Sequence, residues 1–144
     1  MIEPVVKEIW VGAGVEGAFR RFTDEIADWW PTGKHSVSGD ACRDVRFEGW
    51  VGGRILEEAG DGQVHPWGTV TAWEPPARVA FTWHPGREAD TAQRVEVEFW
   101  TEDGGTRVRL THTGWERFGD AGAEMREEYE GGWTFVLSSY AATA

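Results

Sequence analysis

The chain has 144 residues, which suits a single domain with its own core, so residues 1–144 are treated as one domain. Its 25 acidic and 14 basic side chains give a formal net charge of −11, which argues against nucleic acid or an anionic membrane surface as a partner. With Cys42 as the single cysteine and no apolar leader in MIEPVVKEIW, the sequence predicts a cytoplasmic protein without disulfides or a thiolate zinc site.

The first predicted element is a half-exposed antiparallel strand over residues 5–11, where apolar and polar side chains partly alternate. Gly12, Gly14 and Gly17 then reproduce the G-x-G-x-x-G spacing that binds dinucleotides at a strand-to-helix turn. That fold needs a second parallel strand ending in an acidic residue, whereas the polar segment TGKHSVSGDACRD follows here. We therefore interpret the glycines as a flexible turn and expect no cofactor.

Hydrophobic spacing predicts the remaining elements. Apolar residues at helical intervals from 15 to 30, with the cap-forming types Thr23 and Asp24 between them, predict two short helices that end before Pro31. The period then switches to two and predicts strands at 43–50, 53–59, 63–74, 78–84, 93–102 and 106–114. Residues 121–143 return to helical spacing and predict a long helix. We expect an α+β fold in which a curved antiparallel sheet wraps around that helix.

Several segments resemble a known family. DWWPTGKHSV, VGGRILEE, WGTVTAWEPPARVAFTWHPG, TRVRLTHTGWERFG and GGWTFVLSSYA are similar to homologues of the heat-shock-protein-90 ATPase activator, in the START-like (SRPBCC, helix-grip) superfamily. The likeness runs from about Val5 to Tyr140, and the opening helix departs slightly at Gly12-Ala13-Gly14. The resemblance implies a helix-grip fold with a deep cavity between sheet and helix, which superfamily members use for lipids, sterols, polyketides or other apolar molecules.

Strand parity and helical spacing predict which side chains would line such a cavity. Parity points Val45, Phe47, Val79, Phe81, Trp83, Val95, Val97, Phe99, Val108, Leu110 and His112 inward, but it does not decide strands 53–59 and 63–74. The expected ligand-binding residues are Trp30, Phe47, Trp67, Phe81, Trp83, Phe99, His112, Tyr129, Trp133 and Leu137. Their flat surfaces suit an aromatic or polycyclic ligand. The alternative is that these aromatics fill the interior completely.

Candidates for catalysis are few. The four histidines, His35, His65, His84 and His112, show no metal-ligand spacing, so no metal site is expected. If His112 and Glu57 both reach the cavity, they are the weak candidates for acid–base work, with Glu48 behind them. A buried structural histidine is nevertheless commoner than a catalytic one.

Three functions follow as hypotheses. The first is a binding protein, without cofactor, for an apolar aromatic or polycyclic small molecule. The second is a cyclase-, aromatase- or hydrolase-like enzyme using the same cavity. The third is a co-chaperone-like module that stimulates an ATPase, which the resemblance disfavours because such activators carry a separate partner-binding domain. Exposed tryptophans such as Trp10, Trp50 or Trp100 would also be compatible with a homodimer.

Overall fold

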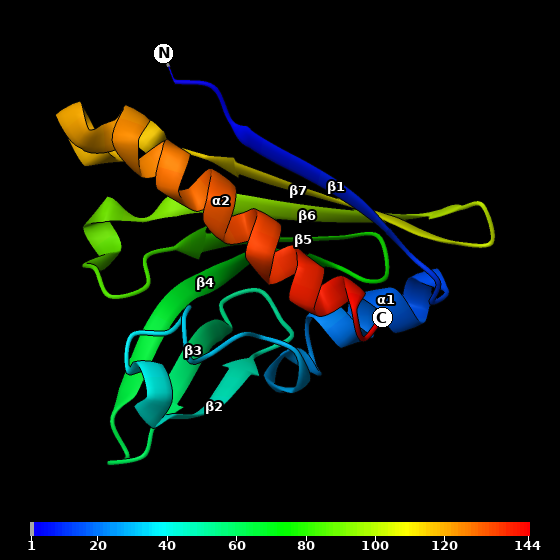
Figure 1. The fold of residues 1–144 in the computed structure, drawn as a ribbon, viewed down its shortest axis with the longest axis horizontal. Helices are drawn as coiled ribbons and strands as arrows, with labels where there is room; N and C mark the ends of the chain where they lie inside the picture. Colours follow the sequence, from blue (N-terminus) through cyan, green and yellow to red (C-terminus); the bar gives the residue numbers. More distant parts are fainter. Residues whose placement is uncertain (1) are drawn as a thin grey trace.

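Seven antiparallel strands form one curved sheet, and a long helix lies across its concave face (Figure 1). The computed structural model describes residues 2–144. The strands are β1 (Val5–Val11), β2 (Cys42–Phe47), β3 (Arg54–Ala59), β4 (Val64–Glu74), β5 (Arg78–Trp83), β6 (Gln93–Glu102) and β7 (Gly105–Thr113). Their order in the sheet is β1-β7-β6-β5-β4-β3-β2, so hairpins join β2 through β7, and β1 pairs with β7 at the edge. This arrangement confirms the predicted α+β helix-grip fold.

The helices are α1 (Val15–Phe22) and α2 (Gly122–Ala141), with short 3-10 turns η1 (Ile26–Asp28), η2 (Gly39–Ala41), η3 (Ala89–Thr91) and η4 (Trp115–Ala121). The second predicted short helix is thus a single 3-10 turn, η1. Its predicted cap at Thr23 is not formed, because the Thr23 hydroxyl donates to the Phe19 carbonyl of α1 instead, at 2.8 Å. The strand predicted over 43–50 ends at Phe47.

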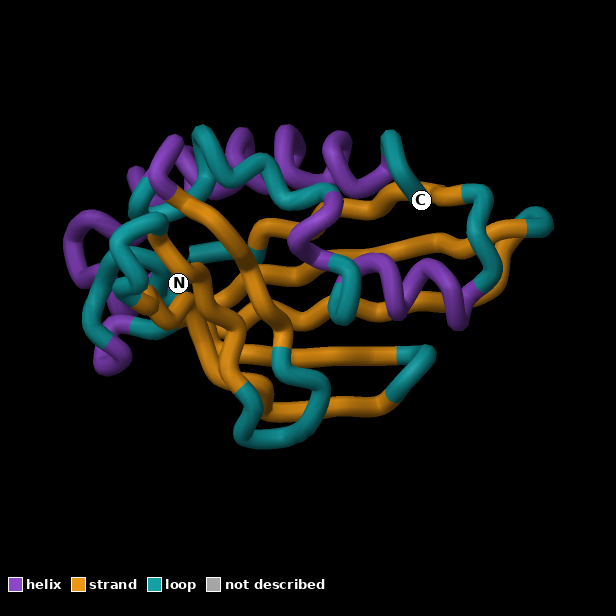
Figure 2. Tube along the Cα trace, turned by 90° about the horizontal axis from the view of Figure 1, so that it is seen from below, coloured by secondary structure: helices purple, strands orange, loops and turns teal. Residues whose placement is uncertain are grey.

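The concave face carries the core, and Figure 2 shows α2 as a layer of its own against the strands. Every strand residue that parity pointed inward is buried. Parity failed for β3 and β4 because their pairing shifts register between Ile55 and Leu56, and that of β4 with β5 shifts between Val70 and Ala72. Each irregularity changes which face the following side chains occupy, so Trp67 and Val70 are both buried although they lie three residues apart.

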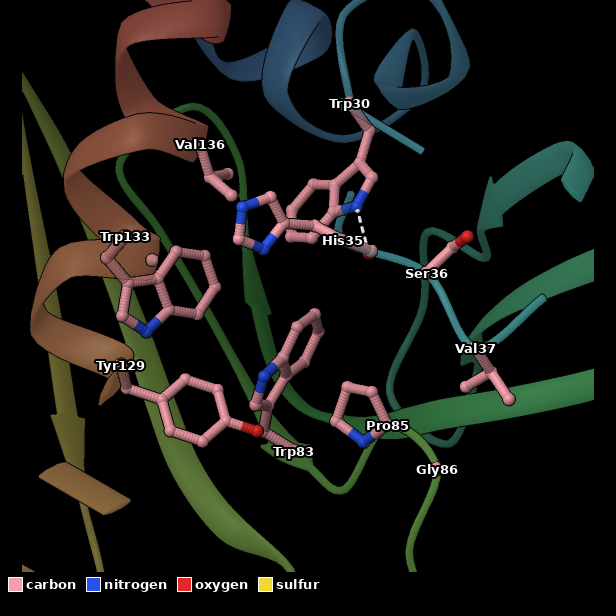
Figure 3. A pocket seen from close by; sticks show the side chains of 11 residues that line it. Trp30, His35, Ser36, Val37, Trp83, Pro85, Gly86, Tyr129, Trp133 and Val136 are labelled. Atoms are coloured by element: carbon pink, nitrogen blue, oxygen red, sulfur yellow. Dashed lines mark hydrogen bonds between the residues drawn. The ribbon is translucent and has the colours of Figure 1, made fainter. Parts of the chain in front are cut away.

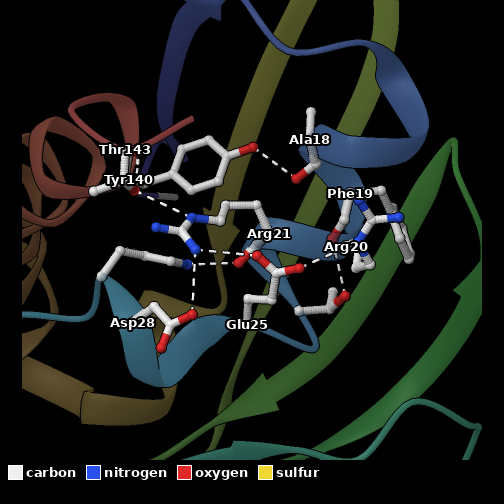
Figure 4. A network of polar contacts seen from close by, with 10 residues as sticks. Ala18, Phe19, Arg20, Arg21, Glu25, Asp28, Tyr140 and Thr143 are labelled. Atoms are coloured by element: carbon white, nitrogen blue, oxygen red, sulfur yellow. Dashed lines mark hydrogen bonds and ion pairs between the residues drawn. The ribbon is translucent and has the colours of Figure 1, made fainter.

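A polar network fastens the chain after α1 to the end of α2 (Figure 4). The Arg21 guanidinium donates to Glu25 at 3.0 Å, to Asp28 at 3.2 Å and to the Thr143 hydroxyl at 3.3 Å. The buried Tyr140 hydroxyl donates to the carbonyl of Ala18 in α1, at 2.7 Å. Trp29, which follows η1, joins this region because its indole N–H donates to the Arg21 carbonyl at 2.7 Å and its own carbonyl accepts from the Ser139 hydroxyl of α2 at 2.5 Å.

Candidate functional site

An open pocket of about 370 Å³ lies between α2, the loop between η1 and η2, and the end of β5 (Figure 3). It is lined by Trp30, His35, Ser36, Val37, Trp83, Pro85, Gly86, Tyr129, Gly132, Trp133 and Val136. Three separate parts of the chain therefore meet there, and most of the lining is apolar or aromatic.

Three tryptophans from three separate parts of the chain form one aromatic wall. Trp30 follows η1, Trp83 ends β5 and Trp133 lies on α2. Their ring centroids are 5.8 Å apart for Trp30 and Trp83, 6.0 Å for Trp30 and Trp133, and 5.5 Å for Trp83 and Trp133. All three are buried, so their orientations are fixed by packing before any ligand arrives.

The mouth of the pocket depends on a close approach between the loop and α2. A Cβ on Gly132 would lie 3.7 Å from Cε1 of His35, whereas a Cβ on Gly131 would meet no atom within 4 Å. One glycine of the mid-helix pair therefore faces the loop and the pocket, and the other faces away. Burial, together with the nearby Lys34 charge, lowers the pKa of His35, so its imidazole is neutral at pH 7.

Glu57 of β3 anchors the loop between η1 and η2. Its buried carboxylate accepts the backbone N–H groups of Val37 at 2.6 Å and Ser38 at 3.0 Å, the Ser38 hydroxyl, and the indole N–H of Trp67 at 2.7 Å. Burial alone raises the pKa of Glu57, but the hydrogen bonds from Ser38, Val37 and Trp67 outweigh it and hold that pKa below its usual value. The carboxylate is thus a charged anchor for the loop.

His112 connects the sheet to α2. Its Nδ1 accepts the indole N–H of Trp133 at 2.9 Å, which leaves Nε2 to donate to the Gln93 side-chain oxygen at 3.3 Å. The ring also stacks on Trp115, with centroids 4.1 Å apart. Burial lowers the pKa of His112 to about 3, so the ring is neutral at pH 7, with Nδ1 bonded to Trp133 and Nε2 bonded to Gln93.

The structure distributes the ten expected ligand-binding residues over several places. Trp30, Trp83, Tyr129 and Trp133 line the pocket. The other six are buried outside its lining: Phe47, Trp67, Phe81, Phe99, His112 and Leu137. Of these, Phe47 borders a second hollow of about 500 Å³ beside α1, together with Phe19 and Trp73. Glu57 and His112 also lie outside the lining of the first pocket.

Sequence reasoning missed most of the loop residues at the mouth. Ser36, Val37, Pro85 and Gly86 lie outside helices and strands, where no periodicity shows which side chains converge. The mid-helix pair Gly131-Gly132 is the one sequence signal for this region, because two successive glycines in a helix favour a kink or a close approach by another part of the chain. The structure places the loop residue His35, not the sheet, next to Gly132.

Between residues 2 and 144, no three His, Cys, Asp or Glu side chains gather in an arrangement that could hold a metal ion. No helix in that part of the chain has the length and apolarity needed to cross a membrane.

Known proteins resemble the chain over nearly its whole length. A family model described as "Activator of Hsp90 ATPase homolog 1-like protein" matches residues 13–143. No curated protein matches the sequence. Among solved structures, the anthrahydroquino-γ-pyrone synthase Txn09, solved as a complex, is 35% identical with a TM-score of 0.61, and the match covers 90% of this chain and 88% of that one.

Two more distant structures share the fold. Protein MLL2253 from Mesorhizobium loti has a TM-score of 0.71 at 19% identity, with 97% of this chain and 95% of that chain covered. The Aha1 dimer from Colwellia psychrerythraea has a TM-score of 0.67 at 21% identity, with 98% and 94% covered.

Proposed function

The chain belongs to the family of activator of Hsp90 ATPase homolog 1-like proteins, and we propose that it binds a flat, polycyclic aromatic small molecule in its open pocket. The observation that carries this proposal is the pocket wall formed by Trp30, Trp83 and Trp133 together with Tyr129. Flat aromatic rings gain contact area and favourable stacking against such a wall.

The size and chemistry of the pocket support the proposal. Small-molecule sites typically enclose about 300–1,000 Å³ and combine apolar walls with few polar groups, and the volume of about 370 Å³ falls in that range. The synthase Txn09, at 35% identity, is named for a fused-ring aromatic product, which favours a ligand of the same general shape.

A matched pair of glycine variants tests the proposal. Gly132→Leu places a side chain in the pocket, whereas Gly131→Leu places the same side chain on the face of α2 that meets no other atom. Both replace a mid-helix glycine by a good helix former, so neither is expected to unfold the protein.

The probes are 2-(hydroxymethyl)anthracene and 2-(hydroxymethyl)anthraquinone, with binding measured by equilibrium dialysis. We expect the wild type and Gly131→Leu to bind at least one probe equally well, and Gly132→Leu to bind it at least tenfold more weakly. The proposed function would be overturned if Gly131→Leu and Gly132→Leu bound the probe with equal affinity, or if the wild type bound neither probe.

A second candidate is catalysis of ring closure on such a ligand, favoured by the similarity to a synthase. His35 and Tyr129 are then the proton-transfer groups, because they line the pocket while Glu57 and His112 are occupied by hydrogen bonds elsewhere. The test incubates the protein with an anthrahydroquinone that carries an open side chain and looks for a fused γ-pyrone by mass spectrometry. Product formation that Tyr129→Phe leaves unchanged, or no product, rejects this assignment.

We also propose that the protein works in the cytoplasm as a homodimer. The related Aha1 structure is described as a dimer, and Trp10 and Trp50 expose 44% and 56% of their surface. Light scattering coupled to size-exclusion chromatography tests this, and a mass of 16.1 kDa at micromolar concentration would reject the dimer.

The only support for the alternative function, stimulation of an ATPase, is the description of the matching family model.

A further inference from the structure

We propose that the ligand of the pocket carries a neutral acceptor oxygen at the edge of its rings, a ketone or quinone carbonyl, which accepts the indole N–H of Trp83. This inference rests on the proposed function and adds the chemical group that the site selects.

The indole nitrogen of Trp83 is exceptional in this structure. Among residues 2–144 it is the single buried side-chain nitrogen or oxygen without a hydrogen-bond partner, and the Trp83 side chain as a whole is only 3% exposed. Buried polar groups in folded proteins are almost always paired, because an unpaired one loses its bond to water and gains nothing in return. A missing partner at this atom therefore requires an explanation.

Other buried indoles show that the fold readily supplies such partners. Each of these N–H groups donates to an acceptor within the chain: Trp29 to the Arg21 carbonyl, Trp30 to the His35 carbonyl, Trp67 to Glu57, Trp115 to the His112 carbonyl and Trp133 to His112. Among the buried tryptophans of residues 2–144, Trp83 alone has an N–H without an acceptor, and Trp83 lines the pocket. The unused donor thus lies where a ligand would bind.

The surroundings of this N–H favour a carbonyl. Figure 3 shows the nitrogen of Trp83 on the edge of the ring that faces Tyr129 and Trp133. Burial raises the pKa of Tyr129, so its hydroxyl stays protonated and brings no negative charge to this side of the pocket. The free N–H of Trp83 therefore matches an acceptor such as a carbonyl oxygen, which has two lone pairs.

An anionic ligand group fits this position less well. Neither lysine nor arginine is among the residues that line the pocket, and the chain carries a net charge of −11. Lys34 and Arg87 act on His35 and Tyr129 from outside this lining, so neither offers a direct ion pair inside the pocket. Moving a charged group into an apolar site without a paired counter-charge costs far more than moving a carbonyl. The donor at Trp83 therefore selects a neutral acceptor.

The experiment compares the two neutral three-ring probes, which differ in the two carbonyl groups of the anthraquinone. We expect the wild type to bind 2-(hydroxymethyl)anthraquinone about three- to tenfold more tightly than 2-(hydroxymethyl)anthracene, as one net hydrogen bond predicts. Trp83→Phe keeps an aromatic ring and removes the donor, so it is expected to bind both probes with affinities within a factor of two.

Trp30→Phe is the matched control. This variant replaces another tryptophan of the same wall by a smaller ring, but the N–H of Trp30 is already bonded to the His35 carbonyl. We therefore expect Trp30→Phe to lower the affinity for both probes and to preserve the ratio of the two affinities. A preference for the quinone that survives in Trp83→Phe overturns this inference while leaving the proposed function standing. Failure of the wild type to bind either probe overturns the proposed function itself.

A second measurement covers the case in which Trp83→Phe does not fold. In ¹⁵N-labelled wild-type protein, the indole N–H resonance of Trp83 is expected to move downfield with the anthraquinone probe and not with the anthracene probe. Equal shifts with the two probes would contradict the hydrogen bond.

Discussion

Replacing Glu57 by glutamine removes the charge from the anchor of the pocket loop while keeping its shape. One carboxylate oxygen accepts from two N–H groups, those of Val37 and Trp67, and the other accepts from the backbone N–H and hydroxyl of Ser38. The glutamine amide can accept at only one of these two positions. Its NH₂ group then faces the Ser38 side, where the hydroxyl can turn around and the backbone N–H cannot.

The expected loss of stability combines two effects. The remaining hydrogen bonds lose their charge-assisted strength, from about 1.5–3 kcal/mol to about 0.5–1.5 kcal/mol each, and the Ser38 N–H is left unpaired at a cost of about 1–3 kcal/mol. Because Ser38 is only partly buried, we take the lower part of these ranges and expect Glu57→Gln to lower the free energy of unfolding by about 2–4 kcal/mol at pH 7.

The assay is urea unfolding of the wild type and Glu57→Gln at several pH values. The lowered pKa of Glu57 in the folded protein means that its charge contributes full stability above the unfolded-state pKa of about 4.3, and that this contribution is lost as pH falls through the folded pKa. The difference between the two proteins should therefore be constant from pH 7 to pH 5 and shrink below about pH 4.

Glu58→Gln is the control in the same strand. Glu58 pairs with Arg43 and Arg46, both largely exposed, and surface pairs of this kind contribute about 0–1 kcal/mol. A loss below about 1 kcal/mol for Glu57→Gln, or a loss equal to that of the control, would refute the anchoring role.

Three further changes test the core. The pKa of His112 is lowered to about 3, so below about pH 6.5 the unfolded state binds a proton that the folded state does not, which should cost about 2 kcal/mol of stability between pH 7 and pH 5. In urea unfolding, the free energy of unfolding of His112→Gln should therefore fall less over this pH range than that of the wild type. An equal fall in both proteins would contradict this. Tyr140→Phe removes the buried hydrogen bond to Ala18 and should cost about 1 kcal/mol by the same assay; no loss would mean that the bond is replaced. Gly68→Ala would place a Cβ 1.8 Å from the Thr82 carbonyl oxygen and should destabilise by at least about 2 kcal/mol in thermal unfolding, whereas a wild-type melting temperature would show that the strands separate easily there.

The sequence by itself determined the order of the strands and main helices, and the buried faces of the strands that alternate regularly. Alternation over residues 78–84, 93–102 and 106–114 predicted three strands and their buried faces, because a strand exposes successive side chains to opposite sides. The same rule did not decide the strand around Trp67, where a shift in strand pairing between Pro66 and Gly68 interrupts the alternation. Proline and glycine inside a strand often mark such a bulge, but alternation alone does not show its effect on the facing of Trp67.

Only the tertiary structure decided which aromatic side chains border open space. Trp67 and Trp83 have similar sequence surroundings and pack against each other, yet Trp67 donates to Glu57 inside the core while Trp83 lines the pocket with a free N–H. The difference comes from contacts between elements distant in sequence, such as Glu57 with Ser38 and His35 with Gly132. Periodicity reports the face on which a side chain lies, whereas a pocket forms where neighbouring elements leave that face uncovered.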